Sequence, residues 1–271
     1  MVSSVHTNTS ALIALQGLNA IGKQLDNVTK QVNTGYKVND ALDDGAAFAV
    51  AQGLRGDLSA IDAVTGQLQS AQGLISVANT AGTQISGDFS TLKSVLVKLS
   101  DADLSASARS DYEAQYTSIV SEISGYISSA TFNGQNLLNG TTAVNIISST
   151  TGSTIAITAF DLNADVVTNL SSAPTDAASA ITLLTGGFST AQTNIANSLA
   201  SFGTGNTRVA NQITYLGAVS DATTTGLGSI VDADLAKQSA KLQSLQTQQQ
   251  LATQTLSIAN QQSSILLNLF K

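Results

Sequence analysis

The chain has 271 residues, of which 42% are hydrophobic and 11% are charged, and its formal net charge is −7. This length suffices for one or two domains, and the acidic balance argues against binding to nucleic acid, which calls for a basic stripe, or to an anionic membrane surface. The chain has no cysteine, which excludes disulfides, thiolate metal sites and cysteine nucleophiles.

The first predicted helix covers residues 4–33 and ends at the helix-stop signal of residues 33–35. Its apolar residues recur at spacings of three and four, which places them on one face of the helix. These residues are Leu18, Ile21, Leu25, Val28 and Val32. Residues 36–45 are predicted to be irregular because they are rich in turn-forming and N-capping residues.

A long second helix is predicted from Ala47 to Leu99, because apolar residues recur there in two rows with a period of seven. Only Asp57 and Gly82 interrupt the two rows. At 1.5 Å per residue, this helix is roughly 80 Å long. Each interior glycine weakens a helix by about 1 kcal/mol relative to alanine. Packing therefore has to hold this helix, and close approach of another segment is the predicted reason for its glycines.

A third helix is predicted over residues 106–130, followed by turns at Asn133-Gly134 and Asn139-Gly140. Residues 142–162 alternate with a period of two and are rich in β-branched side chains, which predicts a β-hairpin with residues 148–153 between its strands. Pro174 is predicted to end the non-helical middle of the chain.

A fourth helix is predicted over residues 175–224, with a weak point at Gly203 and Gly205, and a fifth from residue 232 to the end. The fifth carries two apolar stripes. The first is Leu235, Leu242, Leu245, Ala252, Leu256, Ala259, Leu266 and Phe270, and the second is Leu251, Ile258 and Ile265. A helix with two apolar faces needs more neighbours than one hairpin partner supplies, which indicates a subunit of an assembly rather than an enzyme.

The predicted fold class is mainly α: a long antiparallel helical bundle or coiled-coil rod with a small β-hairpin and paired terminal helices. The alternative from periodicity alone is a monomeric helix bundle. The low charged fraction disfavours that alternative, because the exteriors of lone bundles carry Lys and Glu.

Few residues suggest chemistry, and we predict no catalytic residue, no metal site and no cofactor. The histidine His6 has no partner that would make it a general base. The carboxylates of Asp40, Asp43 and Asp44 lack the spacing of a calcium loop and suit helix capping instead. The start of the chain does not have the pattern of a cleaved signal peptide, and no stretch approaches the ~20 apolar residues of a membrane span.

Several segments resemble the bacterial flagellins, the subunits of the flagellar filament. They lie in the same order and with the same spacing as in that family, and they cover nearly the whole chain: Val5-His6-Thr7-Asn8, Val32 to Asn39 with Asp43-Asp44, Phe132-Asn133-Gly134, Ile230 to Asp234, and Leu266-Leu267. The chain departs from the family at Gly53, where many relatives have arginine, and in its Phe270-Lys271 end.

The resemblance implies a subunit that polymerises into the filament used for motility. It implies an inner filament-core domain of residues 1–35 and 232–271 and an outer rod domain of residues 36–231, with the hairpin region at about 140–173. It also implies a short form without large outer domains, and a protein that is exported without a cleaved signal peptide and is located in the extracellular flagellum. The implied partners are further copies of the chain, paralogous flagellins, an export chaperone at the C-terminal helix, and the cap and junction proteins, with no nucleic acid and no membrane insertion.

Filament-core packing is assigned to the apolar residues of the terminal helices, which we predict to be wholly or partly disordered in the free subunit and to become ordered on association. They are Leu18, Ile21, Leu25, Val28, Val32, Leu242, Leu245, Leu251, Leu256, Ile258, Ile265, Leu266 and Phe270. The positions equivalent to the family's patch for the animal flagellin receptor are Thr91, Val95 and Gln115, two of which replace an Arg and a Glu with neutral side chains. This patch is expected to be inactive.

Two alternative functions remain open from the sequence. One is a hook–filament junction protein with a similar helical core, and the other is a secreted coiled-coil effector or translocator. A translocator requires a long apolar hairpin, which the sequence lacks.

Overall fold

The computed structural model describes the backbone of residues 7–269 and the side chains of residues 7–261. The chain divides into two compact units: unit 1 is residues 1–56 and 221–271, and unit 2 is residues 57–220. Long helices with a small antiparallel strand pair confirm the predicted fold class. The unit boundaries fall inside helices α2 and α6, so they differ from the boundaries of the filament domains expected at residues 35 and 232.

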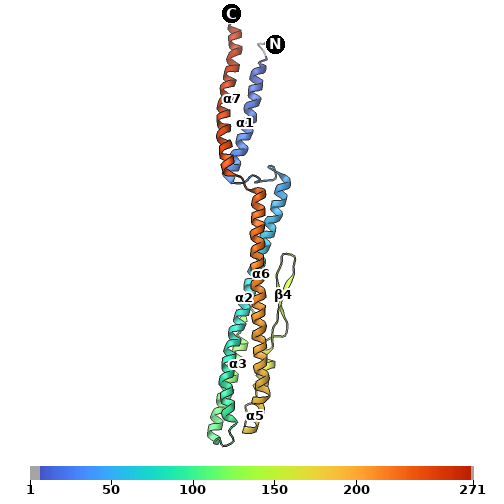
Figure 1. The fold of residues 1–271 in the computed structure, drawn as a ribbon, viewed down its shortest axis with the longest axis vertical. Helices are drawn as coiled ribbons and strands as arrows, with labels where there is room; N and C mark the ends of the chain where they lie inside the picture. Colours follow the sequence, from blue (N-terminus) through green and yellow to red (C-terminus); the bar gives the residue numbers. More distant parts are fainter. Residues whose placement is uncertain (1–6, 270–271) are drawn as a thin grey trace. The chain divides into compact units, whose positions relative to one another are not determined.

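Unit 1 contains a pair of helices from the two ends of the chain, α1 (Thr9–Thr34) and α7 (Leu235–Leu269), which lie side by side (Figure 1). The Asn8 side-chain amide donates a hydrogen bond to the carbonyl of Ala259 at 2.9 Å. At the other end of the pair, the Ala233 N–H donates to the carbonyl of Gly35 at 2.9 Å. These two bonds join opposite ends of the two helices, so the pair is antiparallel, as predicted.

Local capping sets the ends of α1. The Asn8 side chain accepts the Ala11 N–H, so α1 begins at Thr9 and not at the predicted residue 4. Gly35 adopts the left-handed conformation with φ 76° and ends the helix, which confirms the predicted stop signal.

The segment that connects α1 to α2 is held against the end of α6 (Gly187–Val231). The Lys37 and Val38 N–H groups both donate to the Val231 carbonyl, at 2.7 and 3.3 Å. Val38, Ala51 and Val231 form a small buried cluster there. This packing explains why α6 continues to Val231 beyond the predicted end at residue 224. Helix α7 begins at Leu235 rather than at residue 232, because Asp234 caps it by accepting the Lys237 N–H.

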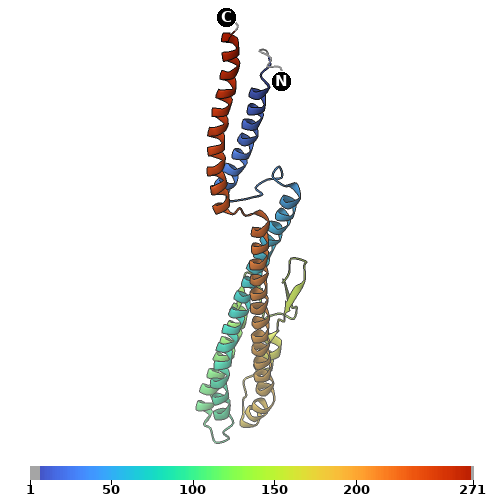
Figure 2. The same cartoon turned by 45° about the horizontal axis from the view of Figure 1, so that its top comes forward.

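In unit 2, parts of α2 (Gly45–Leu99) and α6 lie beside α3 (Ala106–Ser129), as Figures 1 and 2 show. From Ile61 to Leu99 the two predicted heptad rows are buried in one hydrophobic core. Val50, the first residue of the second row, is instead 54% exposed.

Close approach explains two of the α2 glycines. A Cβ atom on Gly82 would lie 2.8 Å from the Leu199 Cδ2 atom, and one on Gly73 would lie 2.9 Å from the Phe132 ring. Gly82 therefore belongs to the packed face and does not interrupt it. Nothing lies within 4 Å of the Cβ position at Gly66 or Gly87, so close approach does not account for these two.

The predicted β-hairpin is present as β3 (Val144–Ile147) and β4 (Thr154–Ile157), with Ile146 opposite Ile155. A shorter hairpin of β1 (Thr131–Phe132) and β2 (Gln135–Asn136) precedes it. Its turn has φ 50° at Asn133 and φ 75° at Gly134, conformations that Asn and Gly adopt readily.

Two predictions for the following segment are wrong. The segment before Pro174 is not entirely non-helical, since it contains a π-helical turn (Asn163–Val167) that leads into α4 (Thr168–Leu170). The fourth predicted helix is divided at Gly186 into α5 (Ala177–Thr185) and α6. A Cβ atom at Gly187 would lie 2.7 Å from the Asn169 carbonyl oxygen, so only glycine permits this approach. By contrast, α6 runs without a break through Gly203 and Gly205.

Candidate assembly surface

The first set of predicted filament-core residues lies along the seam between α1 and α7. Val28 and Leu245 are each only 3% exposed. The other members with described side chains on this seam are half-buried: Leu18, Ile21, Leu25, Val32, Leu242 and Leu256. Within one chain, these residues therefore already pack the helix pair together.

A second set, which we call the outward apolar set, has no such cover. It consists of Leu12, Ile13, Leu15, Leu251 and Ile258. On α7, Leu251 and Ile258 are 62% and 57% exposed and lie seven residues apart, on one face. On α1, Ile13 is 71% exposed. The second stripe predicted from the sequence thus lies outside the helix seam as far as residue 261. The side chains of Ile265 and Leu266, and all of Phe270, lie outside the described residues.

A hollow of about 400 Å³ opens between the two helices near the start of α1. Uncharged residues line it: Thr7, Asn8, Ala11, Leu12, Leu15, Leu256 and Asn260. Part of the outward apolar set therefore borders a concave site.

The connector between α1 and α2 carries an ionic cluster, which we call the connector clamp: Lys30, Asp40 and Asp43. The Lys30 Nζ atom lies 2.6 Å from Asp40 Oδ2 and 2.8 Å from Asp43 Oδ1. Hydrogen bonds from Lys30 lower the pKa of both carboxyl groups, and the bond to Asp40 raises the pKa of Lys30. The clamp therefore ties the connector back to α1 while all three groups are charged.

Sequence reasoning found only part of this arrangement. Asp44 caps α2 as predicted, because its Oδ1 atom accepts the N–H groups of Ala46 and Ala47, both at 3.0 Å. For Asp40 and Asp43, the capping prediction missed the ion pairs with Lys30. The available signal was a lysine near the end of the first helix followed by two carboxylates.

The three receptor-patch positions do not share one environment. Thr91 on α2 and Gln115 on α3 are exposed. Val95 is only 3% exposed and belongs to the hydrophobic core. A partner on this surface therefore cannot reach the Val95 side chain without moving the core.

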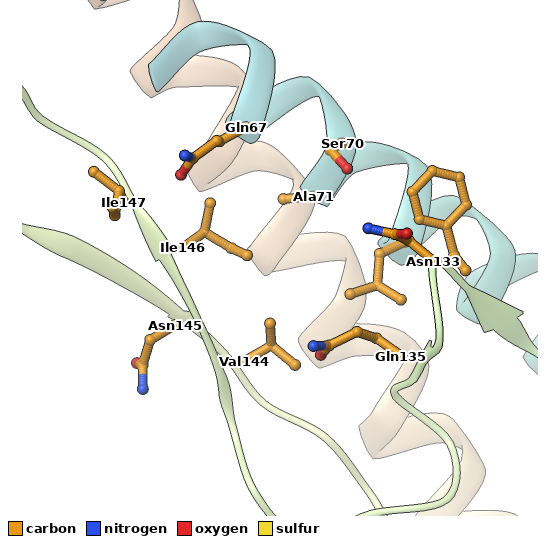
Figure 3. Close-up of a pocket in the computed structure, with 11 residues that line it drawn as sticks. Gln67, Ser70, Ala71, Asn133, Gln135, Val144, Asn145, Ile146 and Ile147 are labelled. Carbon is orange, nitrogen blue, oxygen red and sulfur yellow. The ribbon is translucent and has the colours of Figure 1, made fainter. Parts of the chain in front are cut away.

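A pocket of about 280 Å³ lies between the hairpin and α2 (Figure 3). Val144 and Ile146 extend from β3 towards Ala71 on the helix, and Asn145 extends the other way. The remaining lining residues include the amides of Gln67, Asn133 and Gln135. The pocket is a gap in hairpin packing with an apolar floor and neutral amides at its edges.

Among the described residues, no three His, Asp or Glu side chains are grouped so that they could hold a metal ion. None of the described helices is both long and apolar enough to cross a membrane. His6 lies outside the described residues.

The chain matches two family models. Residues 5–143 match the bacterial flagellin N-terminal helical region, and residues 185–270 match the bacterial flagellin C-terminal helical region. Flagellin FljM of Caulobacter vibrioides is 39% identical over 272 residues, which cover 100% of this chain and 99% of the relative. Flagellin FljO of the same strain is 38% identical with the same coverage.

A solved structure supports the fold. The crystal structure of Bacillus cereus flagellin superimposes with a TM-score of 0.50 and 21% identity, over 56% of this chain and 88% of that chain. The family models and full-length relatives confirm the family identified from the sequence, and nothing in them favours the junction protein or the effector. This chain therefore belongs to the bacterial flagellins and is a structural subunit of the flagellar filament.

Proposed function

We propose that this flagellin polymerises through its paired terminal helices, with the outward apolar set as the surface that becomes buried between copies. The observation that carries the proposal is the exposure of Leu251 and Ile258, at 62% and 57%, on α7. The other apolar stripe of this helix is buried or half-buried from Leu242 to Ala259. Burial of each large apolar side chain contributes about 1.5–3 kcal/mol. Several such residues per subunit supply a driving force for association.

In this proposal the polymer is open and not a closed oligomer. The outward residues lie on two different helices, and the proposed contacts between copies join non-equivalent surfaces. Heterologous contacts that do not close generate a helical filament. In this proposal, residues 1–35 and 232–271 form the inner filament core and residues 36–231 the outer domain, and the terminal helices gain full order on association.

The proposed partners follow from the family. Several flagellins in one Caulobacter strain support copolymerisation of this chain with paralogues. The other proposed partners are an export chaperone that binds α7, a filament cap and junction proteins. The proposed route is export without a cleaved signal peptide, to the flagellum outside the cell. An exposed apolar face on α7 suits chaperone binding before assembly.

Electron microscopy of the purified chain, seeded with filament fragments, tests the proposal. Long filaments that grow from the seeds are the expected result. If the protein binds the seeds in few copies and the seeds do not elongate, the result would support a junction role. If the protein does not bind the seeds at all, the result would contradict polymerisation.

We further propose that this flagellin is a poor agonist of the animal flagellin receptor. Thr91 and Gln115 are exposed but neutral, and threonine cannot reproduce the fork of donors of a guanidinium. A reporter-cell titration with purified monomer should give a much weaker response than a strongly detected flagellin. Equal potency would contradict this proposal.

A further inference from the structure

The connector holds one apolar side chain far out of the fold. Leu42 is 95% exposed, which is the highest value among the large hydrophobic residues that the structure describes, and Ile13 follows at 71%. An exposed leucine is not unusual by itself. The structure of the surrounding turn is what makes Leu42 informative.

The turn around Leu42 is fixed on both sides by carboxylates. Asp40 Oδ1 accepts the Leu42 N–H at 2.8 Å, and Asp43 Oδ2 accepts the Asn39 N–H at 3.0 Å. The connector clamp then binds both carboxylates to Lys30 on α1. Leu42 is therefore presented in a preset position, and little conformational freedom is lost when it is buried by a partner.

We propose that Leu42 is an assembly knob that inserts into the hollow between α1 and α7 of a second copy of this chain. The inference rests on the proposed polymerisation and adds a specific contact to it. The hollow is about 400 Å³, which is larger than a leucine side chain, and its lining is uncharged. Leu12 and Leu15 supply its exposed apolar surface.

Knob and hollow lie at opposite ends of the same helix. Leu12 lies near the start of α1 and Leu42 follows its end at Thr34, so the rise of the helix alone separates them by roughly 30 Å. A chain therefore cannot fill its own hollow with its own knob. Each copy offers one knob and one hollow. When the knob of one copy fills the hollow of another, a knob and a hollow stay free at the two ends of the pair, so the contact is heterologous and repeats into an open array where the rotation between copies does not close a ring.

The cysteine-free sequence allows a direct test by cross-linking. Filaments are assembled from an excess of wild-type chain doped with Leu42→Cys and Leu15→Cys chains, and are then oxidised. The expected result is a disulfide-linked dimer that forms in filaments and not in monomer solution. Val97→Cys replaces Leu15→Cys in the control, because Val97 is 53% exposed but lies on α2 in unit 2. A mixture with Leu12→Cys provides a second position at the same hollow.

The outcomes separate this inference from the proposed function. Wild-type chain that does not elongate seeds contradicts polymerisation itself. If filaments form but Leu42→Cys gives no dimer with either Leu15→Cys or Leu12→Cys, the insertion of Leu42 into the hollow is overturned, while the proposed polymerisation stands.

A second test measures the critical concentration for assembly after a polar and a conservative replacement of Leu42. Leu42→Ser should raise the critical concentration for assembly by about tenfold or more, and Leu42→Met should leave it nearly unchanged. Neither should shift the melting temperature of the monomer, since Leu42 is already in solvent there. An unchanged critical concentration for Leu42→Ser overturns the inference.

Discussion

Tyr116 illustrates how a single polar group holds unit 2 together. Its side chain is 1% exposed, and its hydroxyl donates to the Leu170 carbonyl at 2.6 Å, which ties α4 to α3. Burial raises the pKa of the Tyr116 hydroxyl, so this group stays protonated and remains a donor. Tyr116→Phe leaves the carbonyl without this donor and should lower the free energy of unfolding by about 1–3 kcal/mol. Chemical denaturation measures the loss, with Tyr126→Phe on the exposed side of α3 as the control.

The connector clamp predicts a pH dependence at both ends of the scale. The pKa values of Asp40 and Asp43 lie below their usual 3.8, so the clamp stabilises the connector above that pH and is lost as the pH falls through the lowered values. The pKa of Lys30 lies above its usual 10.5, so its contribution is present below that pH and is lost as the pH rises through the raised value. An NMR titration of the carboxyl carbons should show midpoints below 3.8 in the wild type. Lys30→Met should move both midpoints upwards, and unmoved midpoints would contradict the clamp.

At the scale of one helix, α2 distinguishes glycines that pack from glycines that do not. Gly82→Leu drives a side chain against Leu199 and should destabilise the chain by about 1–3 kcal/mol. Gly87→Ala meets no neighbour and should stabilise it by about 1 kcal/mol through helix propensity. Thermal melting of the two variants gives shifts of opposite sign, and shifts of the same sign would refute the assignment.

Helix α7 is the element whose outward face is proposed to be buried in the filament. Ile258→Asp places a charge that is solvated in the monomer, where Ile258 is 57% exposed, and buried without a partner between copies. The cost in the filament is several kcal/mol, whereas the monomer should be nearly unaffected. Sedimentation of filaments and monomer melting are compared with Gln246→Asp, which adds the same charge at an exposed polar position on a different face of α7 from Leu251 and Ile258. If Ile258→Asp forms normal filaments and its monomer melts at a lower temperature, the proposed burial of this face in the filament is contradicted.

At the scale of the whole molecule, the division into two units predicts separable roles. Deletion of residues 251–271 removes Leu251 and Ile258 from unit 1 and leaves residues 57–220 of unit 2 intact. The truncated chain should stay soluble and largely helical, as circular dichroism measures, but should not sediment as filaments under polymerising conditions. Long filaments from this truncated chain would show that the removed segment is not required.

Much of the fold is determined by local and periodic features of the sequence alone. The stop of α1 at Gly35, the long α2 and the β3–β4 hairpin were all predicted, because caps and periodic burial act over a few residues. The second apolar stripe of α7 was likewise predicted to lie off the helix seam. The family resemblance came from the order of short segments along nearly the whole chain.

Other features were decided by contacts between residues far apart in the sequence, which no local pattern records. The break between α5 and α6 depends on the Asn169 carbonyl approaching Gly187, and Gly82 fits the core because Leu199 lies against it. The turn that presents Leu42 depends on Lys30, which belongs to the preceding helix. The sequence by itself determined which segments are helical and which faces are apolar. Only the tertiary structure decided which of those faces the chain covers itself and which it leaves for another copy, because that depends on how many neighbours each helix has.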